Sequence, residues 1–243
     1  MTTDRPPPST STEALRPVRS FVRREGRLTQ GQRRALQQLL DRYAVPDTAV
    51  LDPAVLFGPG VPVVMDIGFG NGSALVELAR SHPGRGYLGV EVYRPGVGGL
   101  LQRLEQEGIP NVRVACADAV ELLARRVPEA SLAGVQLFFP DPWPKKRHHK
   151  RRMVQPDWAS LVARRLAPGG FLHLATDCSD YAQWMLEVLE GCPELVNASG
   201  RGRFAPGPCG RPDTRFQRRG EARGHPVRDL IYRRLGLVDS LIR

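Results

Sequence analysis

The chain is organised around one stretch, Val135-Gln136-Leu137-Phe138-Phe139-Pro140-Asp141-Pro142-Trp143-Pro144. Its first five residues are apolar or β-prone and lie between a glycine and a proline. This pattern is typical of a buried strand that ends where a proline cannot continue the ladder. Asp141 follows between two prolines that restrict its backbone. The sequence therefore predicts a carboxylate held in a fixed direction at a strand tip.

A cationic segment follows directly, with six positive side chains, two histidines and no acid in residues 145–152. All three lysines of the chain lie in it, and every other cation is an arginine. Asp141 and Trp143 lie just before this cationic segment, an arrangement that suits a reaction on a polyanion. The alternative is a solvated basic loop after a core strand.

Length and composition fit one sizeable α/β domain with additions, since 41% of the 243 residues are apolar and 25% are charged. The net charge of +10 is unevenly distributed. Residues 61–144 hold seven cations and nine acids, whereas residues 201–243 hold eleven cations and four acids. This asymmetry indicates a nucleic-acid or anionic-surface partner.

Targeting and metal signals are absent from the sequence. No apolar run approaches membrane-spanning length, and residues 1–8 lack the apolar region of a signal peptide. The cysteines show no CxxC spacing, and His148 and His149 have no ligand partner at a suitable spacing. We therefore expect a cytoplasmic protein with free thiols, no metal and no membrane partner, as a monomer or a homodimer.

Hydrophobic periodicity alternates between strand and helix from residue 61 onward. Asp180 is expected to cap the last helix, and Pro168-Gly169-Gly170 to stop the helix before it. The alternation with short connections implies an α/β fold with a doubly wound, mostly parallel sheet that binds ligands at the carboxyl ends of its strands. Strands are expected at 61–67, 87–92, 112–116, 135–139 and 171–175, helices at 72–80, 98–107, 119–126, 158–166 and 181–189, and closing strands at 195–198 and 230–233.

The expected domain organisation has three parts. Residues 1–17 are rich in Pro, Ser and Thr and are expected to be a disordered lead-in. Residues 18–60 form a basic arm, which either docks on RNA or is tied to the domain, followed by a helix at 30–43 with a capping box at Thr29 and a proline-containing connector. Residues 61–243 form the main domain with a basic C-terminal segment.

A glycine-rich turn, Asp66-Ile67-Gly68-Phe69-Gly70-Asn71-Gly72-Ser73, follows the first of these strands. Ser73 stands where the dinucleotide fingerprint requires Gly or Ala, which disfavours a nicotinamide oxidoreductase. Gly-x-Gly-x-Gly after an acid is the spacing that S-adenosylmethionine enzymes of this fold use. That cofactor is cationic, so a neighbouring acid attracts it. The alternative is a glycine turn without a ligand.

Two further acids follow the next two strands. Glu91 stands nineteen residues after Gly72, a placement that suits a carboxylate accepting both hydroxyls of a ribose. Asp118 is placed to accept from an adenine amino group, or else to cap the helix that begins at 119. With Asp66 and Asp141, an acid therefore ends each of four successive strands.

These residues resemble the bacterial tRNA (guanine-N7)-methyltransferases, over residues 16–232. The motifs that carry the resemblance are Arg16-Pro-Val-Arg-Ser-Phe, Asp66-Ile-Gly-Phe-Gly-Asn-Gly, Phe139-Pro-Asp-Pro-Trp-Pro-Lys-Lys-Arg-His, Ala175-Thr-Asp and Arg211-Pro-Asp-Thr-Arg-Phe. The resemblance implies the seven-stranded class I methyltransferase fold and methyl transfer from S-adenosylmethionine to N7 of a guanine in the tRNA variable loop.

The resemblance also implies residue roles. Asp141 is the catalytic residue, and it also lines the cofactor pocket. The chain departs from the family at Gln217, where the family has glutamate; an amide still bonds a base edge but brings no charge. Cofactor-binding residues are Asp66, Gly68, Gly70, Glu91, Asp118 and Asp141, and substrate-binding residues are Lys145, Asp177, Thr214, Arg215, Phe216 and Gln217.

Two alternatives stay open, one of them another kind of methyltransferase and one from a different class. Asp141-Pro142-Trp143 resembles the motif of methyltransferases that act on an exocyclic amino group of RNA or DNA, but the second proline of that motif is missing. A non-catalytic RNA-binding module would not require acids at four strand ends.

Overall fold

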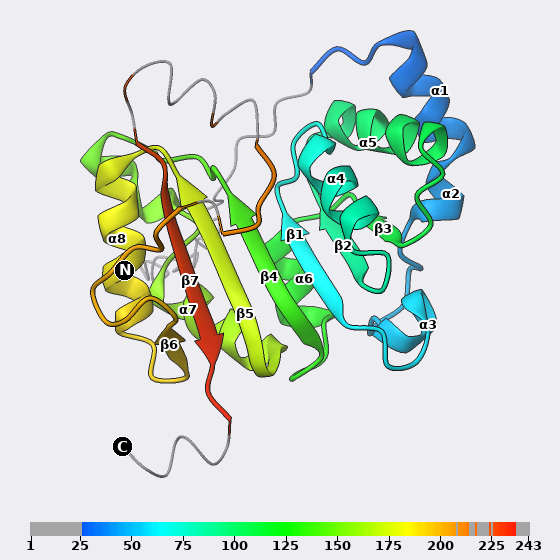
Figure 1. Cartoon of the computed structure of the whole chain (residues 1–243). Coiled ribbons are helices and arrows are strands. Elements are labelled where there is room, and N and C mark those ends of the chain that lie inside the picture. Colours follow the sequence, from blue (N-terminus) through cyan, green and yellow to red (C-terminus); the bar gives the residue numbers. More distant parts are fainter. Residues whose placement is uncertain (1–25, 208, 214–216, 218–223, 225, 237–243) are drawn as a thin grey trace, which may run out of the picture.

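The computed structural model describes residues 26–207, 209–213, 217, 224 and 226–236, and one seven-stranded sheet organises them (Figure 1). The strand order is β3-β2-β1-β4-β5-β7-β6, and β7 runs antiparallel to both of its neighbours. The fold prediction is confirmed. The strands are β1 (Val63–Ile67), β2 (Gly86–Val90), β3 (Val112–Ala115), β4 (Leu132–Phe138), β5 (Leu166–Thr176), β6 (Leu195–Asn197) and β7 (Arg228–Arg234).

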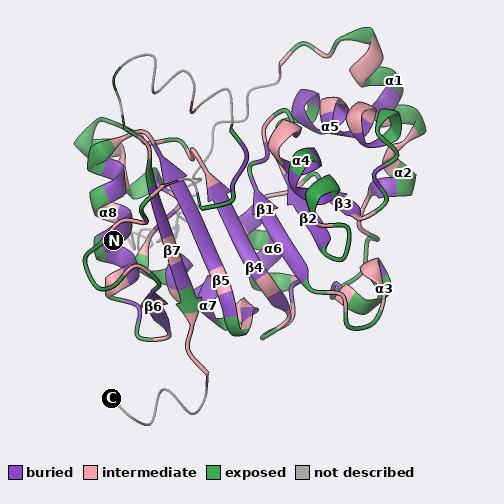
Figure 2. Ribbon diagram, viewed as in Figure 1, coloured by how far each residue is buried: buried purple, intermediate pink, exposed green. Residues whose placement is uncertain are grey.

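Helices cover both faces of the sheet. One apolar cluster joins Val64 of β1 to α1, α4 and α5, and a second joins Met65 to α6, α7 and α8. Neighbouring residues of a strand point to opposite faces, so β1 contributes to both clusters and is buried along its whole length (Figure 2). The helices are α1 (Gln30–Gln38), α2 (Leu40–Tyr43), α3 (Pro53–Phe57), α4 (Ser73–Ser81), α5 (Arg94–Gln106), α6 (Ala119–Arg125), α7 (Pro156–Arg165) and α8 (Ser179–Glu190).

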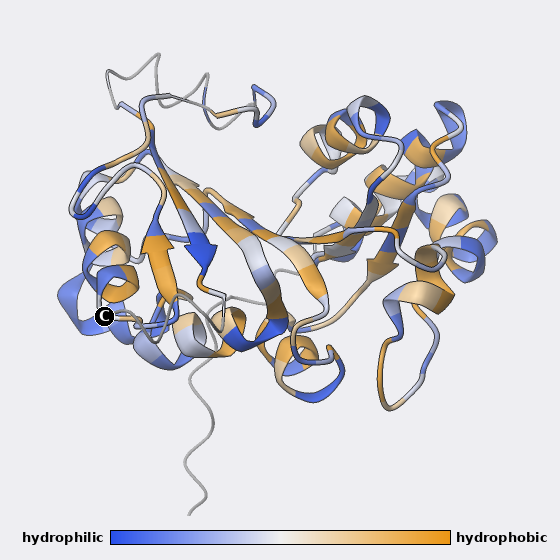
Figure 3. Cartoon of the chain, turned by 60° about the horizontal axis from the view of Figure 1, so that its bottom comes forward, coloured by the Kyte–Doolittle hydropathy of each residue, from blue (hydrophilic) through white to orange (hydrophobic). Residues whose placement is uncertain are grey.

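The amphipathic helices turn polar residues outward, and Figure 3 shows hydrophilic residues along their outer turns. Among the described residues, no helix is both long and apolar enough to cross a membrane.

The N-terminal helix has the predicted capping box. Thr29 Oγ1 accepts from the Gln32 amide at 3.2 Å, and Gln32 Oε1 accepts from the Thr29 amide at 2.9 Å. The helix expected over 30–43 is divided at Leu39 into α1 and α2. The expected connector contains α3, which Asp52 caps through the Ala54 amide at 2.8 Å. The expected arm begins outside the described residues.

One prediction about the second half of the chain is wrong, and another is confirmed only in part. α7 ends at Arg165, before Pro168-Gly169-Gly170 as expected, but β5 already begins at Leu166, which pairs with Leu132 of β4 ahead of a register shift. Asp180 does not cap α8: the N-cap position is Cys178, and Asp180 lies in the first turn, where it pairs with Arg152.

Candidate functional site

The site lies where the chain reverses its direction of progress across the sheet. From β1 the strands continue through β2 to β3 on one side, whereas β4 lies on the other side of β1 and leads to β5. A crevice forms at the carboxyl ends of the strands at such a switch point. A cavity of about 250 Å³ lies there, lined among others by Gly68, Gly70, Glu91, Phe139 and Asp141.

The glycine turn shapes one wall of this cavity. Gly68, Gly70 and Gly72 have φ angles of 71°, 60° and 77°, a region in which residues with a side chain are strained. A Cβ on Gly96 at the start of α5 would lie 2.1 Å from the carbonyl oxygen of Gly70. The helix therefore packs against the turn backbone and fixes its height over the sheet.

Glu91 follows β2 and is locked against the glycine turn. Its Oε2 accepts from the Gly70 amide at 3.0 Å, and its Oε1 accepts from the amides of Val92 and Tyr93 at 2.7 and 3.0 Å. Three backbone donors thus orient one carboxylate on the cavity wall. The remaining lone pairs are available to accept from vicinal hydroxyls.

Asp66 is a buried acid below the turn. It is 3% exposed, and no hydrogen bond to its carboxyl group is found among the described residues. Burial, and then the nearby charge of Glu91, raise the pKa of Asp66 to about 7. An acid in such a position gains a partner when a cation binds above it. It does not itself line the cavity.

Asp118 caps the N-terminus of α6, which is one of the two roles that the sequence left open for it. Its Oδ1 accepts from the amides of Val120 and Glu121 at 2.9 and 3.5 Å, at the start of α6. Its neighbours Ala117 and Ala119 line the cavity. Asp118 itself does not line the cavity, and both of these amides bond to Oδ1 rather than Oδ2.

The turn after β4 carries Asp141 into the site. Asp141 is exposed and lines the same cavity as the glycine turn. Phe139 and Trp143, on either side of it, have φ angles of 52° and 45°. These are unusual for aromatic residues, and each such outlier costs about 1–3 kcal/mol and persists only where the surroundings impose it. The direction of Asp141 is therefore set by the turn.

The cationic segment is a short 3₁₀ helix, η1 (Lys146–Arg151), with Lys145 at its N-cap position. Arg151 lies over the Trp143 ring at 5.0 Å, so the indole packs within the segment. Burial and the surrounding cations, Arg147 first among them, lower the pKa of His148. The segment was predicted to suit a polyanion, but one of its six cations, Arg152, is buried and does not belong to the exposed surface.

A cluster of buried polar side chains joins β7 to Arg211, the first residue of the motif Arg211-Pro-Asp-Thr-Arg-Phe. Arg211 donates to both carboxylate oxygens of Asp229, at 2.7 and 3.0 Å, and His173 Nε2 lies 2.8 Å from the same carboxylate. Burial alone would raise the pKa of Asp229, but these hydrogen bonds hold the pKa below its usual value. Arg211 also donates to Gln217 and lies 5.4 Å from the centre of the Phe139 ring.

The structure brings only part of the predicted site together. Glu91, Asp141 and the two glycines line the cavity, whereas Asp66 and Asp118 do not line it but are sequence neighbours of residues that do. Lys145, Asp177 and Gln217 do not line it. Thr214, Arg215 and Phe216 lie outside the described residues.

Some residues at the site were not predicted to be site residues. Phe138, Phe139 and Met153 line the cavity, and Arg152 and Arg211 support it from below the surface. Arg152 stands in a basic run, so nothing in the sequence distinguishes it from its solvated neighbours, whereas Arg211 begins one of the family motifs.

Comparisons with known proteins decide the family. A family model described as "Putative methyltransferase" matches residues 61–230. The tRNA (guanine-N(7)-)-methyltransferase of Alkalilimnicola ehrlichii is 58% identical over 222 residues, which are 90% of this chain and 93% of that protein. The chain belongs to the tRNA (guanine-N7)-methyltransferase family. The enzyme of the same name from Halorhodospira halophila is also 58% identical, over 90% of this chain and 95% of its own.

A solved structure supports the fold of this methyltransferase. The 16S rRNA methyltransferase KamB has a TM-score of 0.55 and 16% sequence identity, and the match covers 75% of this chain and 90% of that one. At this identity the likeness concerns the fold alone. The resemblance inferred from the motifs is thus confirmed at the level of family and fold.

Proposed function

We propose that this protein transfers a methyl group from S-adenosylmethionine to N7 of a guanine in the variable loop of tRNA. The observation that carries the proposal is the cavity at the switch point, which Glu91 and Asp141 border and below which Asp66 lies buried. Acids in these places attract a cationic ligand and repel phosphates. The family relatives named for this activity support the same substrate.

The residues present fit this donor. The buried Asp66 carboxyl, without a hydrogen bond among the described residues, suits the ammonium group, and the locked Glu91 carboxylate suits the ribose hydroxyls. Asp118 at the α6 cap suits the adenine amino group, and Gly68 and Gly70 allow close approach to the backbone. Bound there, S-adenosylmethionine supplies an electrophilic methyl group on a sulfonium.

The protein's task is alignment rather than proton transfer. Guanine N7 offers a lone pair and no proton to remove, so no general base is required, and the base becomes cationic as it is methylated. Alignment of bound reactants contributes up to roughly 7–11 kcal/mol to a rate. Asp141, on the rigid turn after β4, holds the donor or the base in line and tolerates the positive charge as it moves.

The surface beside the cavity fits a tRNA. Lys145 and the exposed cations of η1 follow the Asp141 turn directly, where they neutralise phosphates. Asp177, immediately after β5, is placed to accept from the N1–H and amino group of the guanine. Gln217, held by Arg211, and the residues 214–216 complete the proposed contacts to the nucleotide.

Radiolabelled methyl transfer to unmodified tRNA, with the modified base mapped, tests the proposal. We expect one labelled guanosine in the variable loop whose ring opens under alkali, as only N7-methylguanosine does readily. Label in an alkali-stable base would instead indicate an exocyclic-amine methyltransferase. Binding of tRNA without retention of S-adenosylmethionine would indicate an RNA-binding module.

A further inference from the structure

The turn that carries Asp141 is short and conformationally unusual. It runs from the end of β4 to η1, and two of its aromatic residues, Phe139 and Trp143, have positive φ angles. The Phe139 amide still donates to the Ala175 carbonyl at 2.7 Å, which extends the sheet by one residue. Past this bond, the turn needs support from outside the sheet to keep its form.

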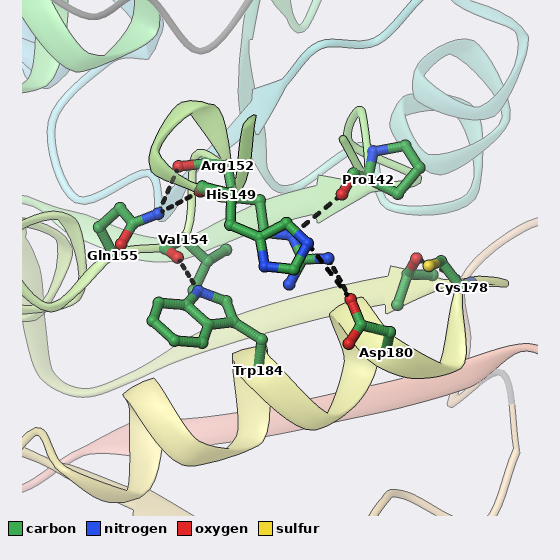
Figure 4. Close-up of polar contacts among 9 residues, drawn as sticks. Pro142, His149, Arg152, Val154, Gln155, Cys178, Asp180 and Trp184 are labelled. Atoms are coloured by element: carbon green, nitrogen blue, oxygen red, sulfur yellow. Dashed lines mark hydrogen bonds and ion pairs between the residues drawn. The ribbon is translucent and has the colours of Figure 1, made fainter. Parts of the chain in front are cut away.

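Arg152 supplies that support from beneath the cationic segment (Figure 4). Its Nε donates to the carbonyl oxygen of Pro142 at 3.0 Å, on the residue next to Asp141. Its Nη2 donates to the Asp180 carboxylate on α8, and the guanidinium lies 4.8 Å from the centre of the Tyr181 ring. The planar guanidinium thus joins the turn to the first turn of a core helix.

The backbone segment that carries Arg152 is itself held by hydrogen bonds. Gln155 Nε2 donates to the carbonyl oxygens of His149 and Arg152 at 3.0 and 3.1 Å. The Val154 carbonyl accepts from Trp184 Nε1 at 2.8 Å (Figure 4). The Val154 amide donates to the Tyr181 hydroxyl at 3.2 Å. Residues 149–155 are therefore bonded to α8, and Arg152 transmits that rigidity to the turn.

Burial separates Arg152 from the other cations of its run. Its side chain is 1% exposed, whereas Lys145, Lys146, Arg147, Lys150 and Arg151 are all exposed. A guanidinium that already bonds a carbonyl and a carboxylate and packs on a ring does not reach a phosphate without breaking these contacts. Five cations of the segment thus lie on the surface proposed to meet the tRNA, whereas Arg152 is buried and does not.

We propose that Arg152 is a positioning residue for the methyl transfer, acting through the Pro142 carbonyl to hold Asp141 in its working direction. The inference rests on the proposed function, in which Asp141 aligns the donor or the base. It assigns Arg152 to the turn rather than to the RNA.

Arg152→Lys is the variant of choice because it keeps the charge but loses the planar fork. We expect kcat to fall on the order of 10²-fold, as for a small misplacement of a reacting group, with the Kd values for S-adenosylmethionine and tRNA within about twofold of wild type. In an Asp141→Asn background the same substitution should have little further effect, because the two residues act as one unit. Arg151→Gln, on the exposed side, should raise KM for tRNA and reduce its salt dependence.

Hydrogen exchange gives a readout that needs no activity. In Arg152→Lys the amides of Asp141 and Trp143 should exchange at least tenfold faster, while those of α8 and β4 stay protected. Asp180→Asn, at a side chain that is 67% exposed, offers a milder variant with the same pattern should Arg152→Lys fold poorly.

The results distinguish a positioning role for Arg152 from an RNA contact and from a merely structural role. Loss of tRNA affinity and of salt dependence in Arg152→Lys, with kcat retained, would make Arg152 an RNA contact and overturn the inference. A lower Tm with unchanged kcat and unchanged exchange at the turn would make it merely structural and also overturn it. Wild-type protein without methyl transfer would refute the proposed function alone, since the exchange experiment would still report on the turn.

Discussion

Replacing Asp66 by asparagine should raise the stability of the ligand-free protein relative to wild type as the pH increases, and weaken its binding of S-adenosylmethionine. Burial raises the pKa of Asp66 to about 7 from a usual value of 3.8. Between these two values the folded state holds a proton that the unfolded chain releases. The free energy of unfolding therefore falls as the pH rises from about 4 to 7.

The size of the effect follows from the shift. A difference of about three pKa units corresponds to roughly 4 kcal/mol at pH 8, of which about 1.5 kcal/mol is already present at pH 5. An asparagine does not titrate, so the difference in stability between Asp66→Asn and wild type should grow by roughly 2–3 kcal/mol between pH 5 and pH 8. The unpaired amide lowers the stability of the variant at both pH values and cancels in this comparison.

Urea unfolding at the two pH values measures the effect as a midpoint difference. For a urea m value of about 2–3 kcal/mol/M, the midpoint of the variant relative to wild type should shift by about 1 M. Asp47→Asn, in an exposed loop, is the matched control and should show no such change. A stability difference that is independent of pH would refute the idea that Asp66 is buried without compensation.

Two further predictions concern the donor site and the RNA surface. Gly96→Ala should push the glycine turn away from α5 and raise the Kd for S-adenosylmethionine, with a loss of about 1–3 kcal/mol of stability from overpacking. Calorimetric titration measures the Kd, and thermal unfolding measures the stability. Gly84→Ala is the control, because a Cβ at that position meets nothing within 4 Å. If six to ten phosphates are neutralised, tRNA affinity should fall about 10³–10⁵-fold between 50 and 200 mM salt, and near-constant affinity by fluorescence anisotropy would contradict the proposed basic surface.

Much of the fold was predictable because local and tertiary preferences agree along most of the chain. The glycine turn and the apolar runs of β1 and β4 allow only a strand that leads into a tight turn, and the structure has both. At Pro168 the prediction held only in part: α7 ends before the helix-breaking residues as expected, but the next strand starts earlier than they indicated. Pairing of Leu166 with Leu132, distant in the sequence, instead begins β5 directly after α7.

The candidate site was predictable where chemistry coincides with a strand end. Glu91 and Asp141 follow their strands immediately, and both line the cavity. Asp180 was expected to cap a helix because aspartate favours that position, but the buried guanidinium of Arg152 holds its carboxylate instead. That partner lies 28 residues away in the sequence, and no local pattern reveals such a pair.

The most direct test of the donor site is the affinity of Glu91→Gln for S-adenosylmethionine, measured by calorimetric titration. Glutamine keeps the shape, but it carries no charge and has one acceptor oxygen in place of two. Loss of charge-assisted bonds worth about 1.5–3 kcal/mol should raise the Kd by roughly 10–150-fold, with the fold confirmed by circular dichroism. A Kd within twofold of wild type would contradict the assignment of this carboxylate, and with it the binding of the methyl donor at the switch point of the sheet.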